Sequence, residues 1–238
     1  MTDPTDPIVF LPGYLCDQRM FYAQAFDLSR DHIVIQAPLL GERCEEMASA
    51  LLPLLPRRFA LVGASLGGIV ALEILRKSPD RVARACLIST DALPEAPNIA
   101  ADREPQIVQC RTGRFDEAVK AAMPTESLAP GAARVDVADL VTEMALGLGR
   151  KGFETHTRAL QRRKDHQSSL YRAQCPIQII AGTHDTLVTP KRQAFMAGLA
   201  PSARFAQLDT AGHLPTLEDP RAVNEILREW LAPKAKAA

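Results

Sequence analysis

The sequence predicts an α/β fold in which a mostly parallel sheet of about six strands carries helices on both faces. Short apolar runs alternate with longer helical patterns through most of the chain, which is typical of parallel strands joined by helices. Between about residues 91 and 172 the alternation stops, and helical patterns continue with Pro and Gly but without a convincing strand. We therefore expect one long helical insertion after the fourth strand.

The first part of the chain accounts for four of the strands. Each is a short apolar run that ends near a proline, a glycine or a polar turn, and each helix between them has an apolar face. The predicted strands span residues 8–11, 33–35, 59–62 and 85–89. The predicted helices between them span residues 17–29, 45–55 and 68–77.

Strand signals return after the insertion, at residues 177–181 and 203–208, and helices follow at about 191–199 and 221–231. This order divides the chain into a core of two parts, an inserted helical segment and a tail. The core is expected at residues 1–92 and 173–232, the insertion at 93–172, and a flexible tail at 233–238.

Composition fits an ordinary globular protein. The 28 Lys and Arg residues balance 28 Asp and Glu residues, 47% of the chain is hydrophobic and 24% is charged. These values exclude a disordered chain, a collagen-like repeat and a coiled coil. A zero net charge also removes the electrostatic argument for nucleic acid or an anionic membrane surface as a partner.

The cysteines and the N-terminal residues favour a cytoplasmic protein. The five cysteines lie far apart and form no C-x-x-C pair, so reduced thiols are expected rather than a zinc site or a redox motif. The first seven residues lack the basic and apolar regions of a signal peptide. No apolar run approaches the roughly 18 residues of a membrane span.

The strongest chemical signal is Gly63-Ala64-Ser65-Leu66-Gly67, which lies between a predicted buried strand and a predicted helix. A strand that turns directly into a helix bends sharply, and small residues around the bend let neighbouring backbone pass close by. The bend exposes the Ser65 hydroxyl at the positive end of the helix. The pattern indicates a nucleophilic serine, against the alternative of an ordinary glycine-rich turn with a serine cap.

A serine hydroxyl needs a general base and a group that orients that base. Asp185 follows the strand predicted at 177–181, and His213 follows the strand predicted at 203–208. Because open parallel sheets gather reactive groups at the carboxyl ends of their strands, Ser65, Asp185 and His213 are expected to meet at one edge.

Four motifs resemble the α/β-hydrolase superfamily, in the order of that family and across nearly the whole chain. They are Phe10-Leu-Pro-Gly-Tyr14, Gly63-Ala-Ser-Leu-Gly67, Gly182-Thr-His-Asp-Thr-Leu-Val-Thr-Pro190 and Gly212-His-Leu-Pro-Thr-Leu-Glu-Asp-Pro220. The resemblance implies the α/β-hydrolase fold, with the helical insertion as a lid over the site. It also implies Ser65 as nucleophile, His213 as general acid and base, and Asp185 as the group that orients and stabilises the imidazolium.

The same resemblance implies an oxyanion hole. Its donors would be the backbone N–H of Leu66 and that of Tyr14, with Leu15 as the neighbouring alternative for the second donor. The chain departs from the family in two places. Pro12-Gly13 stands where many relatives have His-Gly, and only seven residues precede Ile8, which leaves no room for the usual first hairpin and implies a shortened sheet.

Several other polar residues have simpler interpretations. Asp91 follows the fourth strand, where some α/β-hydrolases place the acid, but we expect it to cap the first lid helix. His184 is expected to be structural or to lie at the rim of the site. Cys16 is expected to pack at the start of the first helix, with pocket lining as the alternative. No cofactor is expected, and no metal, because the remaining histidines lack metal-ligand spacing: His32, His156 and His166.

The lid would supply much of the substrate pocket. The candidates for substrate contact are Leu15, Met123, Met144 and Arg162, although packing is the commoner role of such apolar side chains. Residues 151–172 contain six basic and two acidic residues, whereas residues 91–150 contain six and ten. The basic run 158–164 could meet an anionic substrate or an acidic carrier protein, pair with the acidic part of the lid, or form a solvated helix face.

These features predict a cofactor-independent serine hydrolase that cleaves a carboxylic ester of a small or medium-sized molecule through an acyl-enzyme on Ser65. The same triad would serve a C–C bond hydrolase or lyase, a lactonase, a thioesterase or an amidase, and the sequence does not separate these. A non-catalytic ligand-binding module is the alternative from another class. The expected partner is a small-molecule substrate, and the sequence leaves the oligomeric state open.

Overall fold

A computed structural model describes residues 6–232 and contains one sheet of six strands, all parallel, in the order β2-β1-β3-β4-β5-β6. The predicted strand count and the predicted fold class are confirmed. The predicted flexible tail lies outside the described residues. The strands are β1 (Ile8–Leu11), β2 (Val34–Gln36), β3 (Phe59–Ala64), β4 (Val82–Ile88), β5 (Ile177–Gly182) and β6 (Ala203–Leu208).

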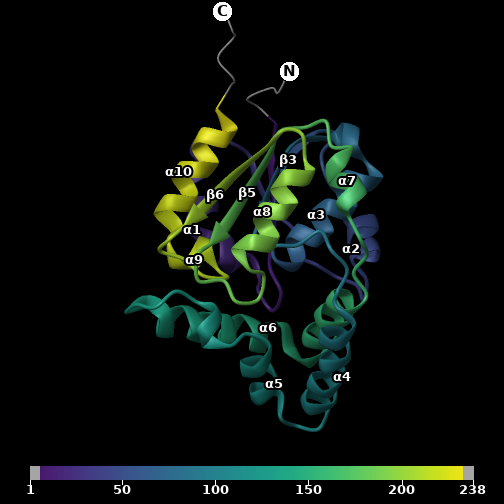
Figure 1. The fold of residues 1–238 in the computed structure, drawn as a ribbon, viewed down its shortest axis with the longest axis vertical. Coiled ribbons are helices and arrows are strands. Elements are labelled where there is room, and N and C mark those ends of the chain that lie inside the picture. The colour runs from purple at the N-terminus through teal and green to yellow at the C-terminus, as the bar shows by residue number, and fades with distance from the viewer. Residues whose placement is uncertain (1–5, 233–238) are drawn as a thin grey trace, which may run out of the picture.

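Helices cover both faces of the sheet (Figure 1). On one face lie α1 (Tyr22–Leu28), α9 (Pro215–Glu218) and α10 (Pro220–Leu231). On the other face lie α2 (Cys44–Leu51), α3 (Leu66–Lys77), α7 (Gln167–Tyr171) and α8 (Pro190–Leu199). Short 3₁₀ helices occupy Gln18–Phe21, Pro79–Arg81 and Thr125–Ser127.

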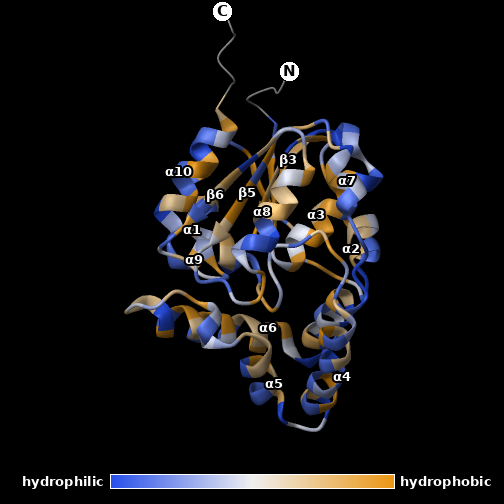
Figure 2. Ribbon diagram, viewed as in Figure 1, coloured by the Kyte–Doolittle hydropathy of each residue, from blue (hydrophilic) through white to orange (hydrophobic). Residues whose placement is uncertain are grey.

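The hydrophobic core lies on the two faces of the central strands. Every residue of β1, β3, β4 and β5 is buried, because helices cover these strands on both sides. Figure 2 shows the central strands mostly in the hydrophobic colour. The edge strands β2 and β6 are partly exposed along their length. This covered sheet supplies a rigid frame whose strand ends carry the candidate site.

The inserted segment between β4 and α7, which is the predicted lid and is called the lid below, contains α4 (Pro97–Arg111), α5 (Phe115–Ala122) and α6 (Ala133–Gln161). Figure 1 shows these helices together beyond the carboxyl ends of the strands. Gly149, with φ 69° and ψ 179°, divides α6 into two helices across a kink. The predicted absence of strands holds for described residues 93–172. Within that range α7 packs against α3 and α8 of the core rather than with the lid helices.

Some elements differ from the sequence prediction at their ends, for local reasons. The helix predicted at 17–29 is a 3₁₀ turn followed by α1, and the Asp17 carboxylate caps the turn by accepting the Arg19 N–H at 2.9 Å. The strand predicted at 85–89 begins earlier, at Val82. Arg84 interrupts the apolar pattern there, but its guanidinium donates to the Trp230 carbonyl and lies over the indole ring, so the residue is buried within the strand.

The turn from β3 into α3 brings three stretches of backbone together. Ser65 adopts φ 47° and ψ −115°, a conformation that an L-residue holds only under strain. A Cβ on Gly67 would lie 2.1 Å from the Leu11 carbonyl oxygen, and a Cβ on Gly63 would lie 2.4 Å from the Gly67 carbonyl oxygen. The absence of side chains at these two glycines therefore allows β1, β3 and α3 to meet at Ser65.

Residues 6–232 include no helix of the length and apolar character needed to cross a bilayer.

Substituting Gly67 tests this close approach. We expect Gly67→Ala to lower the free energy of unfolding by about 3 kcal/mol or more, because the new methyl group meets main-chain atoms that side-chain rotation does not relieve. Urea denaturation followed by circular dichroism measures the change. Gly198→Ala is the matched control: it lies in α8 with open space around it, and we expect a gain of up to about 1 kcal/mol. Equal effects of the two substitutions would contradict the explanation.

Candidate active site

Ser65, His213 and Asp185 lie in one hydrogen-bonded chain at the carboxyl edge of the sheet. His213 Nε2 is 3.1 Å from Ser65 Oγ, and His213 Nδ1 is 2.9 Å and 3.0 Å from the two carboxylate oxygens of Asp185. Ser65 follows β3, Asp185 follows β5 and His213 follows β6. All three side chains are buried, with at most 8% of each residue exposed.

The hydrogen bonds determine the roles of the two imidazole nitrogens. A carboxylate oxygen only accepts, so His213 Nδ1 carries the hydrogen that is donated to Asp185. In the neutral ring Nε2 then holds the lone pair, and it accepts the hydrogen of the Ser65 hydroxyl. This tautomer places a proton acceptor against a serine oxygen, which is the arrangement that nucleophilic catalysis by a serine requires.

The loop after β5 and the neighbouring helix α8 hold the Asp185 side chain in place. Its Oδ1 accepts the backbone N–H groups of Leu187 and Val188, each at 2.9 Å. Its Oδ2 accepts the side-chain amide of Gln193, on α8, at 3.3 Å. Hydrogen bonds of this kind satisfy the oxygens of a buried carboxyl group and restrict its rotation. Asp185 therefore presents fixed acceptor oxygens to His213.

The His213 loop is held from both the core and the lid. The Glu218 carboxylate accepts the backbone N–H groups of Gly212 at 2.9 Å and Leu214 at 2.7 Å, on either side of His213. The His213 N–H donates to the carbonyl of Ser127, which belongs to the lid. A Cβ on Gly212 would lie 2.3 Å from that same carbonyl oxygen, so the lid passes directly against the loop.

The predicted oxyanion donors lie in a tight turn and at a helix start. Leu66 is the first residue of α3, where the N–H has no intrahelical partner. Residues 13–16 form a turn closed by the Cys16 N–H on the Gly13 carbonyl at 3.1 Å, with Leu15 at φ 59°. The Leu15 N–H donates to His156 Nδ1 at 3.4 Å. Within the described part of the chain the Tyr14 N–H has no acceptor, so of the two alternatives Tyr14 is the one with a free donor.

The Tyr14 side chain is embedded in the lid. Thr157 Oγ donates to the Phe153 carbonyl, so the Tyr14 hydroxyl is the donor in its 2.8 Å hydrogen bond to Thr157 Oγ. The Tyr14 ring packs against the Phe153 ring, with centroids 6.4 Å apart, and the Arg103 guanidinium lies 5.7 Å from its centre. Burial raises the pKa of Tyr14 to about 12, so the phenol stays protonated.

A cavity of about 240 Å³ lies beside the 13–16 turn, between the core and the lid. Cys16 lines it, which is the alternative considered from the sequence, and burial raises the pKa of its thiol to about 12. The remaining walls are mostly apolar and include Phe10, Phe21, Leu39 and Leu148. Ser65 does not line this space.

Three of the four predicted substrate contacts are buried side chains in this structure. Leu15 and Met144 are fully buried, and Met123 is 8% exposed. The Met144 sulfur lies 3.5 Å from the Asp17 N–H, and the Met123 sulfur lies 3.9 Å from Ser127 Oγ. Neither methionine lines the cavity. Both methionines therefore have contacts within the chain, and substrate contact by these residues stays a prediction.

Asp91 does not cap the first lid helix, and that prediction is wrong. Helix α4 begins at Pro97, whereas Asp91 is buried and accepts the Leu93 N–H at 3.0 Å. Its carboxylate forms ion pairs with Arg192 of α8 and with Arg163, which lies 3.7 Å away. Asp91 is therefore an electrostatic connection between the core and the lid rather than a member of the triad.

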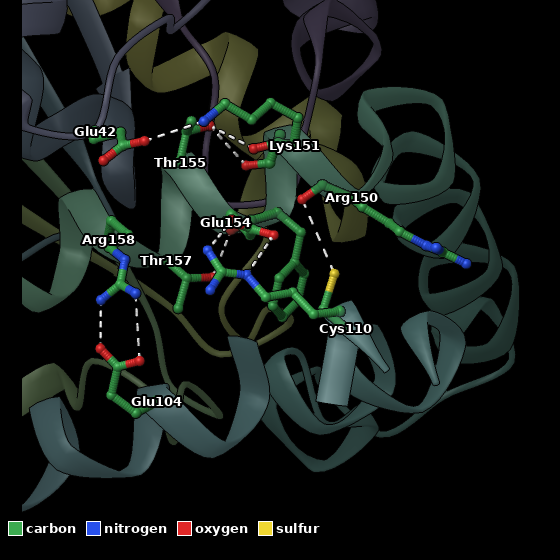
Figure 3. Close-up of polar contacts among 12 residues, drawn as sticks. Glu42, Glu104, Cys110, Arg150, Lys151, Glu154, Thr155, Thr157 and Arg158 are labelled. Atoms are coloured by element: carbon green, nitrogen blue, oxygen red, sulfur yellow. Dashed lines mark hydrogen bonds and ion pairs between the residues drawn. The ribbon is translucent and has the colours of Figure 1, made fainter. Parts of the chain in front are cut away.

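The basic run 158–164 pairs with carboxylates of the same chain. Figure 3 shows Arg158 facing Glu104, and Lys151, which precedes the run, facing Glu42. The other pairs are Arg162 with Glu42, Arg163 with Glu95 and Asp91, and Lys164 with Glu45. Arg163 is buried, so the solvated-face interpretation is wrong for it. Pairing within the chain, with both the lid and the core, is the observed role.

Sequence reasoning missed three residues that support the triad and the turn beside it: Gln193, Glu218 and His156. Glu218 lies within a matched motif, but nothing in that motif states which N–H groups its carboxylate accepts. Gln193 and His156 have no local signal at all, because their partners lie on other elements.

Comparisons with known proteins identify the family of this chain. A model of the Alpha/beta hydrolase family matches residues 8–226. The pimeloyl-[acyl-carrier protein] methyl ester esterase of Aromatoleum aromaticum is 30% identical over 203 residues, which cover 77% of this chain and 78% of that protein. The biotin biosynthesis bifunctional protein BioHC of Teredinibacter turnerae is 26% identical over 96% of this chain, which spans only 45% of that relative.

Solved structures of other proteins also resemble this chain. A thermophilic esterase from Thermogutta terrifontis superimposes with a TM-score of 0.85 and 26% identity, covering 95% of this chain and 89% of the esterase. The enol-lactonase from Burkholderia xenovorans has a TM-score of 0.84 at 22% identity, covering 95% of this chain and 91% of that one, which shows the shared fold.

Removing the Asp91 charge tests the connection between core and lid. We expect Asp91→Asn to lower the free energy of unfolding by about 3 kcal/mol, because it leaves the buried Arg163 guanidinium with one partner fewer. Denaturant unfolding measures the loss. Glu225→Gln is the control, since its pair with Arg221 is exposed and should change stability by less than about 0.5 kcal/mol. A similar loss in both variants would argue against a special role for Asp91.

Proposed function

The chain belongs to the alpha/beta hydrolase family, and from that premise we propose that it cleaves a carboxylic ester of a small or medium-sized molecule through an acyl-enzyme on Ser65. The main observation that supports this proposal is the buried chain of hydrogen bonds from Asp185 through His213 to Ser65 Oγ. Esterases among the similar proteins support the ester as the bond that is cleaved.

In the proposed acylation step Ser65 Oγ attacks the ester carbonyl while His213 Nε2 takes the hydroxyl proton. Asp185 stabilises the imidazolium that forms. The N–H groups of Leu66 and Tyr14 would receive the negative charge on the carbonyl oxygen. His213 then gives its proton to the leaving alcohol as the carbon–oxygen bond breaks, which leaves the acyl group on Ser65.

Deacylation repeats these steps with water as the nucleophile. His213 takes a proton from water, the resulting hydroxide attacks the acyl carbonyl, and the proton returns to Ser65 Oγ as the acid leaves. The groups used are those of the chain itself, and all three side chains are excluded from bulk water by the fold. A preorganised, buried site of this kind strengthens each electrostatic contact that the reaction uses.

The charges around the lid favour an uncharged ester as the substrate. Every cation of the run 158–164 already faces a carboxylate of the chain, so these residues offer less attraction to an anionic substrate than their number suggests. A lactone or a thioester presents the same carbonyl chemistry to the same triad and remains the second class of substrate.

We also propose a cytoplasmic location and a small molecule as the partner. The five cysteines are free and buried, which suits a reducing compartment.

Replacing the nucleophile is the direct test of the proposed function. We expect Ser65→Ala to abolish hydrolysis of short-chain aryl esters and labelling by a fluorophosphonate probe, while circular dichroism and the melting temperature stay close to wild type. A panel of esters, lactones, thioesters and vinylogous diketones, run with both proteins, identifies the bond that is cleaved. Undiminished turnover in the variant would exclude Ser65 as nucleophile. A wild-type protein that neither turns over nor labels would instead favour a ligand-binding module.

Substitutions at two aspartates test which of them is the acid of the proposed triad. We expect Asp185→Asn to lower kcat by about 10³- to 10⁴-fold, because an amide in that place no longer stabilises the imidazolium and favours the other tautomer. Asp91→Asn, measured at a temperature where it is folded, should keep kcat within a few-fold of wild type. The reverse result would assign the acid to Asp91.

A further inference from the structure

His156 is a buried lid residue whose two ring nitrogens contact two different core loops. It lies in the second half of α6, beyond the Gly149 kink, and is 2% exposed. Its Nδ1 is 3.4 Å from the Leu15 backbone nitrogen, and its Nε2 is 3.3 Å from the Leu39 carbonyl oxygen. The ring therefore bridges the 13–16 turn and the loop that follows β2.

These partners determine the tautomer of the ring. A carbonyl oxygen only accepts, so Nε2 carries the hydrogen that is donated to Leu39. Nδ1 then has the lone pair, and it accepts the Leu15 N–H. Burial lowers the pKa of His156, so the neutral ring that this pattern needs is the stable form. Both nitrogens are fully used by these two bonds.

The Leu15 N–H belongs to a turn that leucine does not favour. The Cys16 N–H closes the turn on the Gly13 carbonyl, and within it Leu15 has a positive φ of 59° while Tyr14 does not. This combination is a type II turn, whose third position favours glycine. Rotation of the Tyr14–Leu15 peptide by half a turn would give a type I turn and relieve the strain at Leu15.

That rotation would exchange the places of the Leu15 N–H and the Tyr14 carbonyl oxygen. The carbonyl oxygen would then face the lone pair of His156 Nδ1, which is repulsive. The turn lies against the nucleophile, since a Cβ on Gly13 would be 3.4 Å from Ser65 Cβ. A rotated peptide would consequently reverse a backbone dipole beside the site where the proposed oxyanion forms.

We propose that His156 is a positioning residue of the oxyanion hole, whose Nδ1 lone pair holds the Tyr14–Leu15 peptide in the orientation of the strained turn and so keeps residues 13–16 in place beside Ser65. The inference rests on the proposed function. It makes the geometry of the oxyanion hole depend on the second half of the lid helix α6, which also holds the Tyr14 side chain through Thr157 and Phe153.

Two substitutions separate the two hydrogen bonds of the ring. In His156→Asn the side-chain oxygen lies as many bonds from Cα as Nδ1 does, so it keeps an acceptor for the Leu15 N–H. In His156→Gln the side-chain nitrogen corresponds to Nε2, so it keeps the donor to Leu39. We expect His156→Gln to lower kcat by about 10- to 100-fold with KM within about 3-fold, and His156→Asn to keep kcat within about 3-fold of wild type.

A change at Leu15 provides the matched background. Glycine adopts the left-handed conformation without strain, so in Leu15→Gly the turn no longer depends on His156. We expect the kcat loss caused by His156→Gln to shrink below about 3-fold when it is measured against Leu15→Gly, at a temperature where every variant is folded. An equal loss in the two backgrounds, or equal losses in the Asn and Gln variants, would make His156 a packing residue and overturn the proposal.

Two further measurements test the proposal even if a variant loses stability or the substrate is unknown. Nitrogen NMR of the wild-type imidazole should show Nδ1 unprotonated and Nε2 protonated, and the opposite tautomer would overturn the proposal without any substitution. The rate at which a fluorophosphonate labels Ser65 reports on the nucleophile and the oxyanion hole for any substrate. If the wild-type protein hydrolyses no ester of the panel, the proposed function fails. If the labelling rate nevertheless falls in His156→Gln, this inference still stands.

Discussion

The close approach of β1, β3 and α3 is the constraint on which the rest of the site depends. A Cβ at Gly67 would overlap the Leu11 carbonyl, so the helix that starts at the nucleophile touches the main chain of the neighbouring strand. Ser65, which directly precedes this helix, has a strained backbone conformation, and Gly13 of the 13–16 turn lies beside it. The covered parallel sheet supplies the rigidity that keeps such strain in place, because all of β1, β3, β4 and β5 is buried.

The lid is part of the site rather than a separate cover. The Ser127 carbonyl receives the His213 N–H, the Tyr14 side chain inserts between α4 and α6, and His156 accepts the Leu15 N–H. Each contact ties a catalytic loop of the core to lid residues far away in the sequence. Movement of these lid residues would therefore change the positions of His213 and of the 13–16 turn together.

Electrostatics fixes how the lid sits on the core. The zero net charge of the chain conceals an acidic first part and a basic last part of the insertion, and the structure turns these into ion pairs. The buried pairs of Arg163 with Asp91 and Glu95 need both partners, because an isolated charge in that place would be costly. The same cations are consequently less available to an anionic ligand.

The sequence by itself determined the fold class, the six strands and the three residues of the buried hydrogen-bonded chain. Strand periodicity and sharp strand-to-helix turns are local properties, and parallel strands place their carboxyl ends at one edge, so Ser65, Asp185 and His213 could be expected to meet. Only the tertiary structure decided the role of Asp91, the pairing of the basic run and the contact between His156 and Leu15. These contacts join side chains that lie more than 50 residues apart in the sequence, such as Asp91 and Arg163. A local sequence pattern does not show which of them will meet.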